Sequence, residues 1–353
     1  MPHSNTILGT RRIAVLTAAT LSVLVAVLGS HAADAQAPTA QAPAAPSSGQ
    51  RTTVEIYDDF DKPRYSQADY VAKWANIYGP GELAAGGTSS FARGAFSVSA
   101  VPFKTANDVS VFDHLKYIAI STKTFPVPTD GSVEISSTIK ASTPGTQPGR
   151  VIHGTYTESG APYAQPTLEG QQAGVVMNVI DFSTGQLFDW FVSGHTAFPL
   201  IERLPSNVTG NAQSGSPDYV GTDKMYTQII KEIPASPGAH TVSIRFSRAG
   251  GVGSVDYFFD GKNVAHVDHV GIPLDVQGVP FTGTYPSLGA GEELGSKIDS
   301  LAIGHGLFSL LDAFPFQHPD APALSVSIPP SERLFGQGAT GTFDDFKVKT
   351  VSR

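Results

Sequence analysis

The regular alternation of apolar and polar residues constrains this chain more than any other feature. Apolar side chains fall on alternate positions in 96–100, 133–139 and 242–246, separated by serine, threonine or charged residues. A period of two is that of a β-strand with one buried face and one wet face. An almost continuous apolar run at 174–180 predicts a strand covered on both faces. The turn that follows predicts its return in a hairpin through 187–192.

The chain contains 36 glycines and 26 prolines among its 353 residues, which indicates many turns and few long helices. An Asp-Gly pair between two apolar runs predicts a second hairpin over 255–267, because glycine adopts positive φ at no steric cost. The clearest helix is predicted over 66–77, with Ser66 as its N-cap. The final strand, over 346–349, is expected at a sheet edge with its lysines outward.

These short strands and glycine- and proline-rich loops predict an all-β fold, a two-sheet antiparallel β-sandwich with one or two short helices. Hydrophobic residues make up 41% of the chain, which is enough for a sizeable core. Residues 36–51 are rich in alanine and proline, cannot bury a core, and are expected to form a disordered linker. No comparable linker interrupts 52–353, which we expect to form a single domain.

Residues 1–35 have the organisation of a bacterial secretory signal peptide. Arg11 and Arg12 precede an uncharged apolar run at 13–28, and an Ala-x-Ala cleavage site ends at Ala35. The run is about 16 residues long, shorter than the roughly 20 that span a bilayer, which disfavours an uncleaved anchor. The arginine pair also allows twin-arginine export. We therefore expect a secreted or periplasmic protein that is not inserted in the membrane after cleavage.

The charge and cysteine content exclude several classes of partner and chemistry. The formal net charge is −8, and the basic residues are not clustered. Nucleic acids and anionic lipids bind through clustered lysine and arginine, so neither is an expected partner. The chain has no cysteine, which excludes thiol catalysis and cysteine-ligated zinc.

Three segments resemble the concanavalin A-like jelly roll of secreted lectins and glucanases. They are Tyr-Asp-Asp-Phe at 57–60, the hairpin around Asp-Gly-Lys at 255–267, and Phe-Asp-Asp-Phe-Lys-Val at 343–348. The resemblance implies that 52–353 is a jelly roll in which the first and last strands pair with each other. It also implies a carbohydrate ligand, by analogy of fold alone.

Further segments look like an uncharacterised family of secreted bacterial proteins within that fold group. They are Gly-Gln-Leu-Phe-Asp-Trp at 185–190, Ile-Glu-Arg-Leu-Pro at 201–205 and Gly-His-Gly-Leu-Phe-Ser-Leu-Leu-Asp at 304–312, together with the same hairpin. This resemblance covers about 54–350 and implies no particular activity.

Glucanases of this fold typically carry a Glu-x-Asp-x-x-Glu or Glu-x-Asp-x-Glu strand whose outer carboxylates act as nucleophile and acid/base. This sequence has no such strand. The nearest pair, Asp256 and Asp260, is separated by roughly 13 Å of strand, against about 5 to 5.5 Å in a retaining enzyme. The absence of the carboxylate strand favours a binding protein over an enzyme.

The segment 188–203 combines the side-chain types that bind sugars. A tryptophan ring stacks on the C–H face of a sugar, while carboxylate, guanidinium and imidazole groups hydrogen-bond its hydroxyls. The predicted ligand-binding residues are Asp189, Trp190, His195, Glu202 and Arg203. The alternative is structural, with Trp190 in the core and Glu202 and Arg203 in an ion pair.

A hydrolase or lyase needs an acid and a base. His195, with Tyr226 or Glu202, is the candidate pair for these roles. His305 lies between two glycines beside an apolar run, where a core or turn histidine is expected rather than a ligand.

Calcium binding is implied by the same resemblance. Jelly-roll domains often bind calcium where the first and last strands meet, and clustered carboxylates suit this hard cation. The predicted ligands are Asp58, Asp59, Asp344 and Asp345, with Asp61 nearby. The alternative is that these residues cap strands and turns. No other cofactor is expected.

Three functions are compatible with the sequence. A carbohydrate-binding or cell-envelope recognition protein is favoured, and the alternatives are a polysaccharide hydrolase or lyase and a non-catalytic structural envelope protein. The directions of Trp190, Glu202 and Arg203 separate these functions. Projection from a concave face favours binding or catalysis, whereas burial favours the structural role.

Overall fold

The computed structural model describes residues 49–75, 87–105, 111–221, 226–270, 292–293, 297–313 and 326–353. They belong to the compact unit Ser48–Arg353. The predicted signal peptide and nearly all of the predicted linker lie outside the described residues, and Arg51 already belongs to the first strand. No helix in the described part of the chain is long and apolar enough to cross a membrane.

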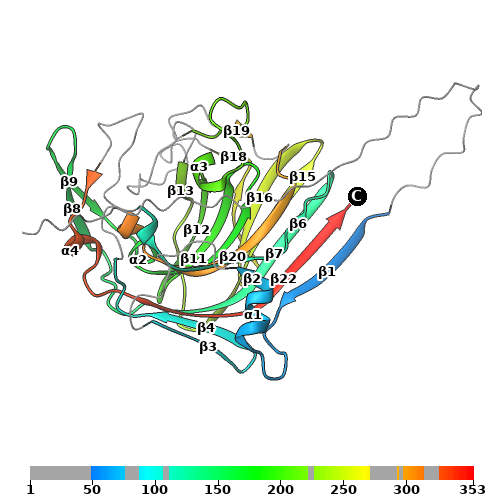
Figure 1. The fold of residues 1–353 in the computed structure, drawn as a ribbon, viewed down its shortest axis with the longest axis horizontal. Coiled ribbons are helices and arrows are strands. Elements are labelled where there is room, and N and C mark those ends of the chain that lie inside the picture. The colour runs from blue at the N-terminus through cyan, green and yellow to red at the C-terminus, as the bar shows by residue number, and fades with distance from the viewer. Residues whose placement is uncertain are drawn as a thin grey trace, which may run out of the picture. The chain divides into compact units, whose positions relative to one another are not determined.

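The larger secondary-structure elements form two antiparallel sheets (Figure 1). Sheet A has the order β17-β16-β15-β7-β22-β4-β3, with β1 paired to β22. Its strands are β1 (Arg51–Asp58), β3 (Thr88–Ala92), β4 (Ala95–Ala100), β7 (Gly131–Ser142), β15 (Ala239–Ala249), β16 (Val252–Phe259), β17 (Lys262–Val267) and β22 (Ala339–Ser352).

Sheet B has the order β13-β12-β11-β10-β20-β5-β2, with β14 paired to β12 and β6 paired to β20. Its strands are β2 (Trp74–Ala75), β5 (Leu115–Ser121), β6 (Phe125–Pro126), β10 (Gly174–Asp181), β11 (Gln186–Val192), β12 (Thr196–Arg203), β13 (Tyr226–Ile229), β14 (Ile233–Pro234) and β20 (Ser300–Phe308). The predicted two-sheet antiparallel sandwich is confirmed.

The remaining elements are short. Two small sheets are formed by β8 (Val151–Tyr156), β9 (Pro162–Pro166) and β21 (Val326–Ser327), and by β18 (His269–Val270) and β19 (Glu292–Glu293). The α-helices are α1 (Gln67–Lys73), α2 (Glu169–Gln172), α3 (Ser206–Thr209) and α4 (Pro330–Arg333), and the 3-10 helices are η1 (Val111–His114) and η4 (Leu310–Ala313).

The core between the sheets is built from the alternating side chains. Val133, Ile135 and Ile139 of β7 are fully buried and belong to one hydrophobic cluster with Phe188 and Trp190 of β11. Sheet B is buried on its other face too, where alternate residues of β10 and β11 form a second cluster. This confirms the prediction of a strand covered on both faces at 174–180.

The strand order confirms one expectation and corrects another. β1 pairs with β22, so the first and last strands are neighbours, as the resemblance implied. The expected edge position of the last strand is wrong. β22 lies inside sheet A, because β7 pairs along one side of it while β1 and β4 share the other.

Both predicted hairpins are confirmed, as β10–β11 and β16–β17. The second turns at Asp260 and Gly261, whose φ values are 49° and 75°. The Ser66 cap is also confirmed, because its hydroxyl accepts from the Asp69 N–H and the Asp69 carboxylate accepts from the Ser66 N–H. The helix ends earlier than predicted, since Trp74 leaves α1 to pair with β5.

Candidate functional site

The turn between β11 and β12 presents His195 to solvent. Ser193 closes this turn, donating its backbone N–H to the Thr196 carbonyl at 2.8 Å and its hydroxyl to the same oxygen at 2.7 Å. The His195 side chain is 73% exposed. The candidate site therefore lies at the end of two central strands of sheet B, on a turn that is fixed by its own hydrogen bonds.

Glu169, the first residue of α2, fixes the His195 ring from below the surface. Its buried carboxylate accepts from the hydroxyls of Thr143 (3.0 Å), Thr146 (3.1 Å) and Ser193 (3.2 Å), and from the His195 backbone N–H (3.1 Å). Glu169 Oε1 also lies 3.1 Å from His195 Nδ1. Burial raises the pKa of Glu169, but the hydrogen bonds from His195, Thr143 and Thr146 outweigh it and lower that pKa overall.

This contact determines which nitrogen of His195 is available. A carboxylate can only accept a hydrogen bond, so His195 Nδ1 carries a proton. In the neutral ring, Nε2 then has a free lone pair that can accept a hydrogen bond or a proton.

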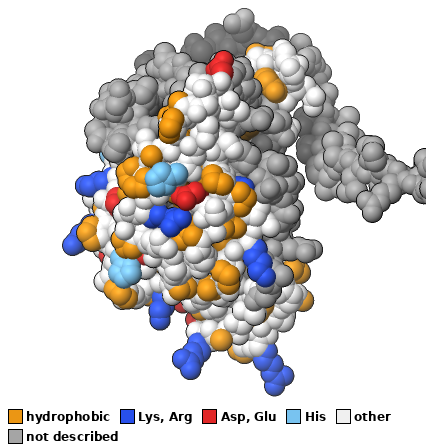
Figure 2. All heavy atoms as spheres, turned by 90° about the vertical axis from the view of Figure 1, so that its left-hand side faces the viewer, with side chains coloured by type: hydrophobic (Ala, Val, Ile, Leu, Met, Phe, Trp, Pro, Cys, Tyr) orange, Lys and Arg blue, Asp and Glu red, His pale blue; other side chains and the backbone are white. Residues whose placement is uncertain are grey.

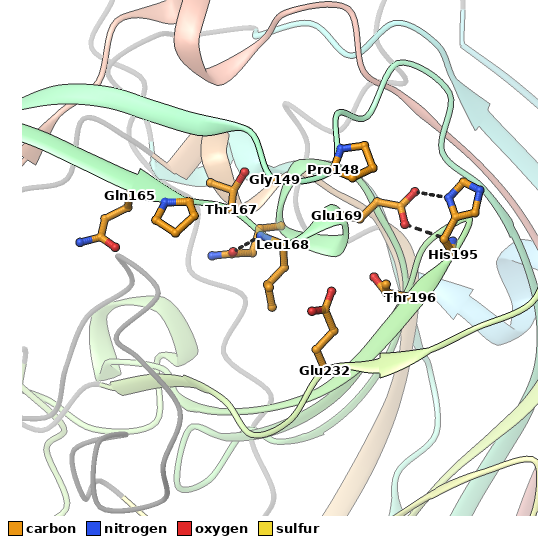
Figure 3. Close-up of a pocket in the computed structure, with 11 residues that line it drawn as sticks. Pro148, Gly149, Gln165, Thr167, Leu168, Glu169, His195, Thr196 and Glu232 are labelled. Atoms are coloured by element: carbon orange, nitrogen blue, oxygen red, sulfur yellow. Dashed lines mark hydrogen bonds and ion pairs between the residues drawn. The ribbon is translucent and has the colours of Figure 1, made fainter.

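A cavity of about 470 Å³ opens beside this dyad (Figure 3). Figure 3 shows Glu232 directed toward the cavity, on the side opposite Glu169. The remaining walls mix apolar surfaces with hydrogen-bonding groups, from Pro148, Gly149, Gln165, Pro166, Thr167, Leu168, Gln171 and Thr196. A volume of about 300 to 1,000 Å³ with a few placed polar groups is typical of small-ligand sites.

Glu169 and Glu232 are site residues that the sequence analysis missed. Glu169 begins a four-residue helix whose N-cap residue makes no side-chain cap hydrogen bond. Its hydrogen-bond donors include Thr143 and His195, each 26 residues away along the chain. No local pattern marks such a residue, because only the tertiary fold brings its partners together.

Trp190 corrects the predicted sugar platform. Its side chain has no exposed surface, and its indole Nε1 donates to the Ser243 carbonyl at 3.1 Å. The ring packs in the inter-sheet core against Tyr257 and Phe259, at centroid distances of 6.1 and 5.5 Å. The prediction of an exposed tryptophan is therefore wrong, and the structural alternative holds for this residue.

Asp189 and Glu202 lie on the face of sheet B opposite to Trp190. Asp189 pairs with Asn178 across β10–β11, and Glu202 pairs with Leu187, two residues along β11 from Asp189. The two carboxyl groups are thus diagonal neighbours on adjacent strands.

The surroundings of this pair favour protonated carboxyl groups. Asn178 Nδ2 donates to Asp189 Oδ1 at 2.6 Å, and Thr227 Oγ1 donates to Glu202 Oε2 at 2.8 Å. Burial and the nearby Glu202 raise the pKa of Asp189 far above its ordinary range. Burial also raises the pKa of Glu202 to about 7, against the effect of the Thr227 hydrogen bond.

The predicted acid–base partners of His195 are wrong on geometry. β12 runs from Thr196 to Arg203, and Glu202 lies seven residues beyond His195, a separation of roughly 23 Å along an extended strand. Tyr226 pairs with Arg203 at the same far end of β12, and its side chain lies outside the described part of the structure. Arg203 and Glu202 are consecutive strand residues, so their side chains leave opposite faces of the sheet.

Asp58 is a structural residue rather than a metal ligand. Its buried carboxylate accepts from Trp74 Nε1 (2.8 Å), Tyr65 OH (2.7 Å) and Lys73 Nζ (2.9 Å). These bonds join the end of β1 to α1 and β2. The predicted calcium role of Asp58 is not supported, since three protein donors already occupy its oxygens.

The other predicted calcium ligands do approach one another. Burial raises the pKa of Asp344, and the nearby charges of Asp345, Asp61 and Asp59 raise it further despite a hydrogen bond from the Asp345 N–H. Among the described residues, however, no three His, Asp or Glu side chains are arranged to hold a metal ion. The geometry therefore supports the predicted pairing of the chain ends but not the predicted calcium site.

Comparison with solved structures finds similar folds. An endo-1,3-β-glucanase from Streptomyces sioyaensis is 11% identical with a TM-score of 0.41, and the match covers 89% of this chain and all of the glucanase chain. β-Agarase B from Zobellia galactanivorans is 10% identical with a TM-score of 0.44, over 86% and 95% of the two chains. Lectin UEA-II, solved with galactose, is 8% identical with a TM-score of 0.33, over 85% and 99%.

None of the curated proteins matches the sequence. A family model does match most of the chain, over residues 84–352, and it is described as a family of unknown function, DUF6081. This agrees with the resemblance of the 185–190, 201–205 and 304–312 segments to an uncharacterised family. The chain belongs to this family, DUF6081.

Proposed function

We propose that this protein is an exported glycan-binding protein and that the glycan occupies the cavity beside His195. The observation that carries the proposal is the make-up of that cavity. Proline and leucine surfaces lie next to imidazole, carboxylate and amide groups within about 470 Å³. A sugar ring presents C–H faces and hydroxyl groups in the same close mixture, so this lining suits it on both counts.

The preorganisation of His195 supports the same proposal. An exposed side chain ordinarily loses rotamer freedom when it binds a ligand, at a cost of about 0.5 to 1.5 kcal/mol. The His195 ring already has one orientation, because Glu169 bonds both its Nδ1 and its backbone N–H. Its Nε2 is therefore ready to accept from a ligand hydroxyl without that cost.

The same dyad favours a second candidate function, a polysaccharide hydrolase or lyase. A carboxylate that fixes the Nδ1 proton of a histidine leaves Nε2 as a general base. Glu232 provides a second titratable group in the same cavity. We place this candidate second for two reasons. Among the described residues that line the cavity, no nucleophile is hydrogen-bonded to His195. No contact in the cavity identifies which residue would donate the proton that the reaction also needs.

One experiment separates these functions. The protein is incubated with a broad panel of polysaccharides, and each is scored for retained protein and for new reducing or unsaturated chain ends. If a polysaccharide retains the wild-type protein without the appearance of new chain ends, and does not retain His195→Ala, the result supports binding. New ends that are lost in the same variant make the protein an enzyme.

The matched control is His153→Ala, because His153 is also an exposed histidine, 66% exposed, but lies on β8 outside the cavity walls. This variant is expected to behave as the wild type. If the wild-type protein neither binds nor cleaves any member of the panel, both proposals fail and the structural envelope role takes their place.

A further inference from the structure

A second cavity, of about 500 Å³, lies at the edge of the sandwich where β14 approaches the start of β15 and the β16–β17 turn. Its walls include Lys231 and Lys262, the His240–Asp260 pair, Ser236 and the ring of Phe259. It is separate from the cavity beside His195. Lys231 lines the second cavity whereas its neighbour Glu232 lines the first, so this segment of chain is a wall of both.

The His240–Asp260 pair forms part of the cavity wall, and each of its side-chain nitrogen and oxygen atoms has a hydrogen-bond partner. His240 is buried, with Nδ1 2.8 Å from Asp260 Oδ2 and Nε2 2.7 Å from the Ser236 carbonyl. Both ring nitrogens of His240 are therefore engaged within the protein. The other oxygen of Asp260 accepts from the Thr241 N–H at 2.9 Å. Both oxygens of the Asp260 carboxylate are therefore hydrogen-bonded, by His240 and the Thr241 N–H rather than by the lysines.

Lys231 and Lys262 leave the cavity with excess positive charge. Both are exposed, and within the described residues no carboxylate lies at ion-pairing distance from either ammonium. The nearby Asp256 is bonded elsewhere, by Arg245, Asn263 and His266. Two ammonium groups against the single Asp260 carboxylate leave the cavity walls with an excess of positive charge, in a chain whose net charge is −8. This excess concentrates anions at the cavity.

The apolar wall limits what kind of anion fits. The Phe259 ring lies 4.6 Å from the His240 ring, centroid to centroid, and is nearly buried. Ile233, Pro234 and Val264 add further apolar surface. The cavity is larger than a bare inorganic ion needs, and its lining suits a ring or short chain that carries an anionic substituent.

We infer that the cavity between Lys231, Lys262 and the His240–Phe259 wall is a binding site for the anionic group of an organic ligand. The anionic group is a carboxylate, sulfate or phosphate that is carried on a small ring compound. An acidic sugar and a phosphate ester are two sources of that chemistry. The inference does not depend on glycan binding beside His195, because the two cavities have different walls.

The test measures binding of four probes to the full chain by titration calorimetry at low ionic strength. The probes are galacturonate, galactose 6-sulfate and glucose 6-phosphate, with galactose as the neutral control. The compared proteins are the wild type, the double variant Lys231→Gln/Lys262→Gln, and Lys349→Gln, which removes an exposed lysine of β22 outside the cavity.

We expect at least one anionic probe to bind the wild type at least ten-fold more tightly than galactose does. The double variant should lose at least ten-fold in affinity for that probe, and Lys349→Gln should lose less than two-fold. Which probe binds best identifies the source of the anionic group.

The inference is overturned if no anionic probe binds more tightly than galactose, or if the double variant binds as the wild type does. These results are independent of the His195 experiment, since His195→Ala leaves both lysines in place. If the wild-type protein binds no polysaccharide but does bind an anionic probe, only the glycan proposal is rejected.

Discussion

His305 lies in the centre of the inter-sheet core, enclosed by the rings of Trp74, Phe96 and Phe343. Its Nε2 is 2.8 Å from the Tyr70 hydroxyl, and burial lowers its pKa from 6.5 to about 3. Two flanking glycines and an apolar run were enough to predict a core histidine. The aromatic enclosure was not predictable, because its members come from three different strands, β2, β4 and β22.

The lowered pKa of His305 predicts a loss of stability in acid. The unfolded chain binds a proton near pH 6.5 while the folded chain does not until about pH 3, so the free energy of unfolding falls as pH drops through this window. The expected slope is about 1.4 kcal/mol per pH unit at most. Urea unfolding at pH 7, 6, 5 and 4 should show this slope in the difference between the wild type and His305→Gln, because the contributions of the other titrating groups cancel in that difference. Equal slopes in the two proteins would contradict the assignment, and the exposed His266→Gln provides the control.

Glu202 is predicted to have the opposite effect. Its folded pKa of about 7 lies above the ordinary 4.5, so its favourable contribution is present below pH 4.5 and is lost as pH rises through 7. Glu202→Gln keeps the Thr227 hydrogen bond but removes the charge of this half-buried side chain. We expect its free energy of unfolding to exceed that of the wild type by about 1 to 3 kcal/mol at pH 8 and to be nearly unchanged at pH 4. An equal difference at both pH values, with Glu232→Gln as the surface control, would show that Glu202 does not titrate there.

At the scale of elements, Asp58 joins β1 to α1 and β2. The Ser66 cap and the hairpin turns were predictable because each is a contact between residues a few positions apart. The Asp58 contacts reach Tyr65, Lys73 and Trp74, and they depend on how α1 lies against the sheets. The interior position of β22 was not predictable for a related reason. Its outward lysines mark a wet face of the sheet, but they do not show whether neighbouring strands lie on both sides.

Asp58→Asn should destabilise the protein. The asparagine retains a single acceptor oxygen, so a buried donor among Trp74, Tyr65 and Lys73 loses its partner, at a cost of about 1 to 3 kcal/mol. Asp59→Asn, next to it at a more exposed position, should cost less than 0.5 kcal/mol. Thermal unfolding measures both variants. Calcium is predicted to leave the wild-type melting temperature unchanged, and a rise of several degrees with calcium would restore the metal-site interpretation.

At the scale of the whole molecule, the sequence predicted the architecture better than the site. Alternating side chains follow directly from burial of one face of a strand, so the sandwich and its core strands were readable from local patterns. The His195–Glu169 dyad requires α2, the β7 end with Thr143 and the β11–β12 turn to meet in space. His195 could be selected as a titratable residue, but neither its buried partner nor its distance from Glu202 followed from composition.

The central claim is that the cavity beside His195 binds a glycan. It is tested most directly by the dissociation constant of the best-retained polysaccharide, measured for wild type, His195→Ala, Glu232→Gln and the His153→Ala control. We predict at least ten-fold weaker binding in the two cavity variants, each a loss of about 1.4 kcal/mol or more, and wild-type affinity in the control. Unchanged affinity in both cavity variants would contradict the claim, because the glycan would then bind elsewhere.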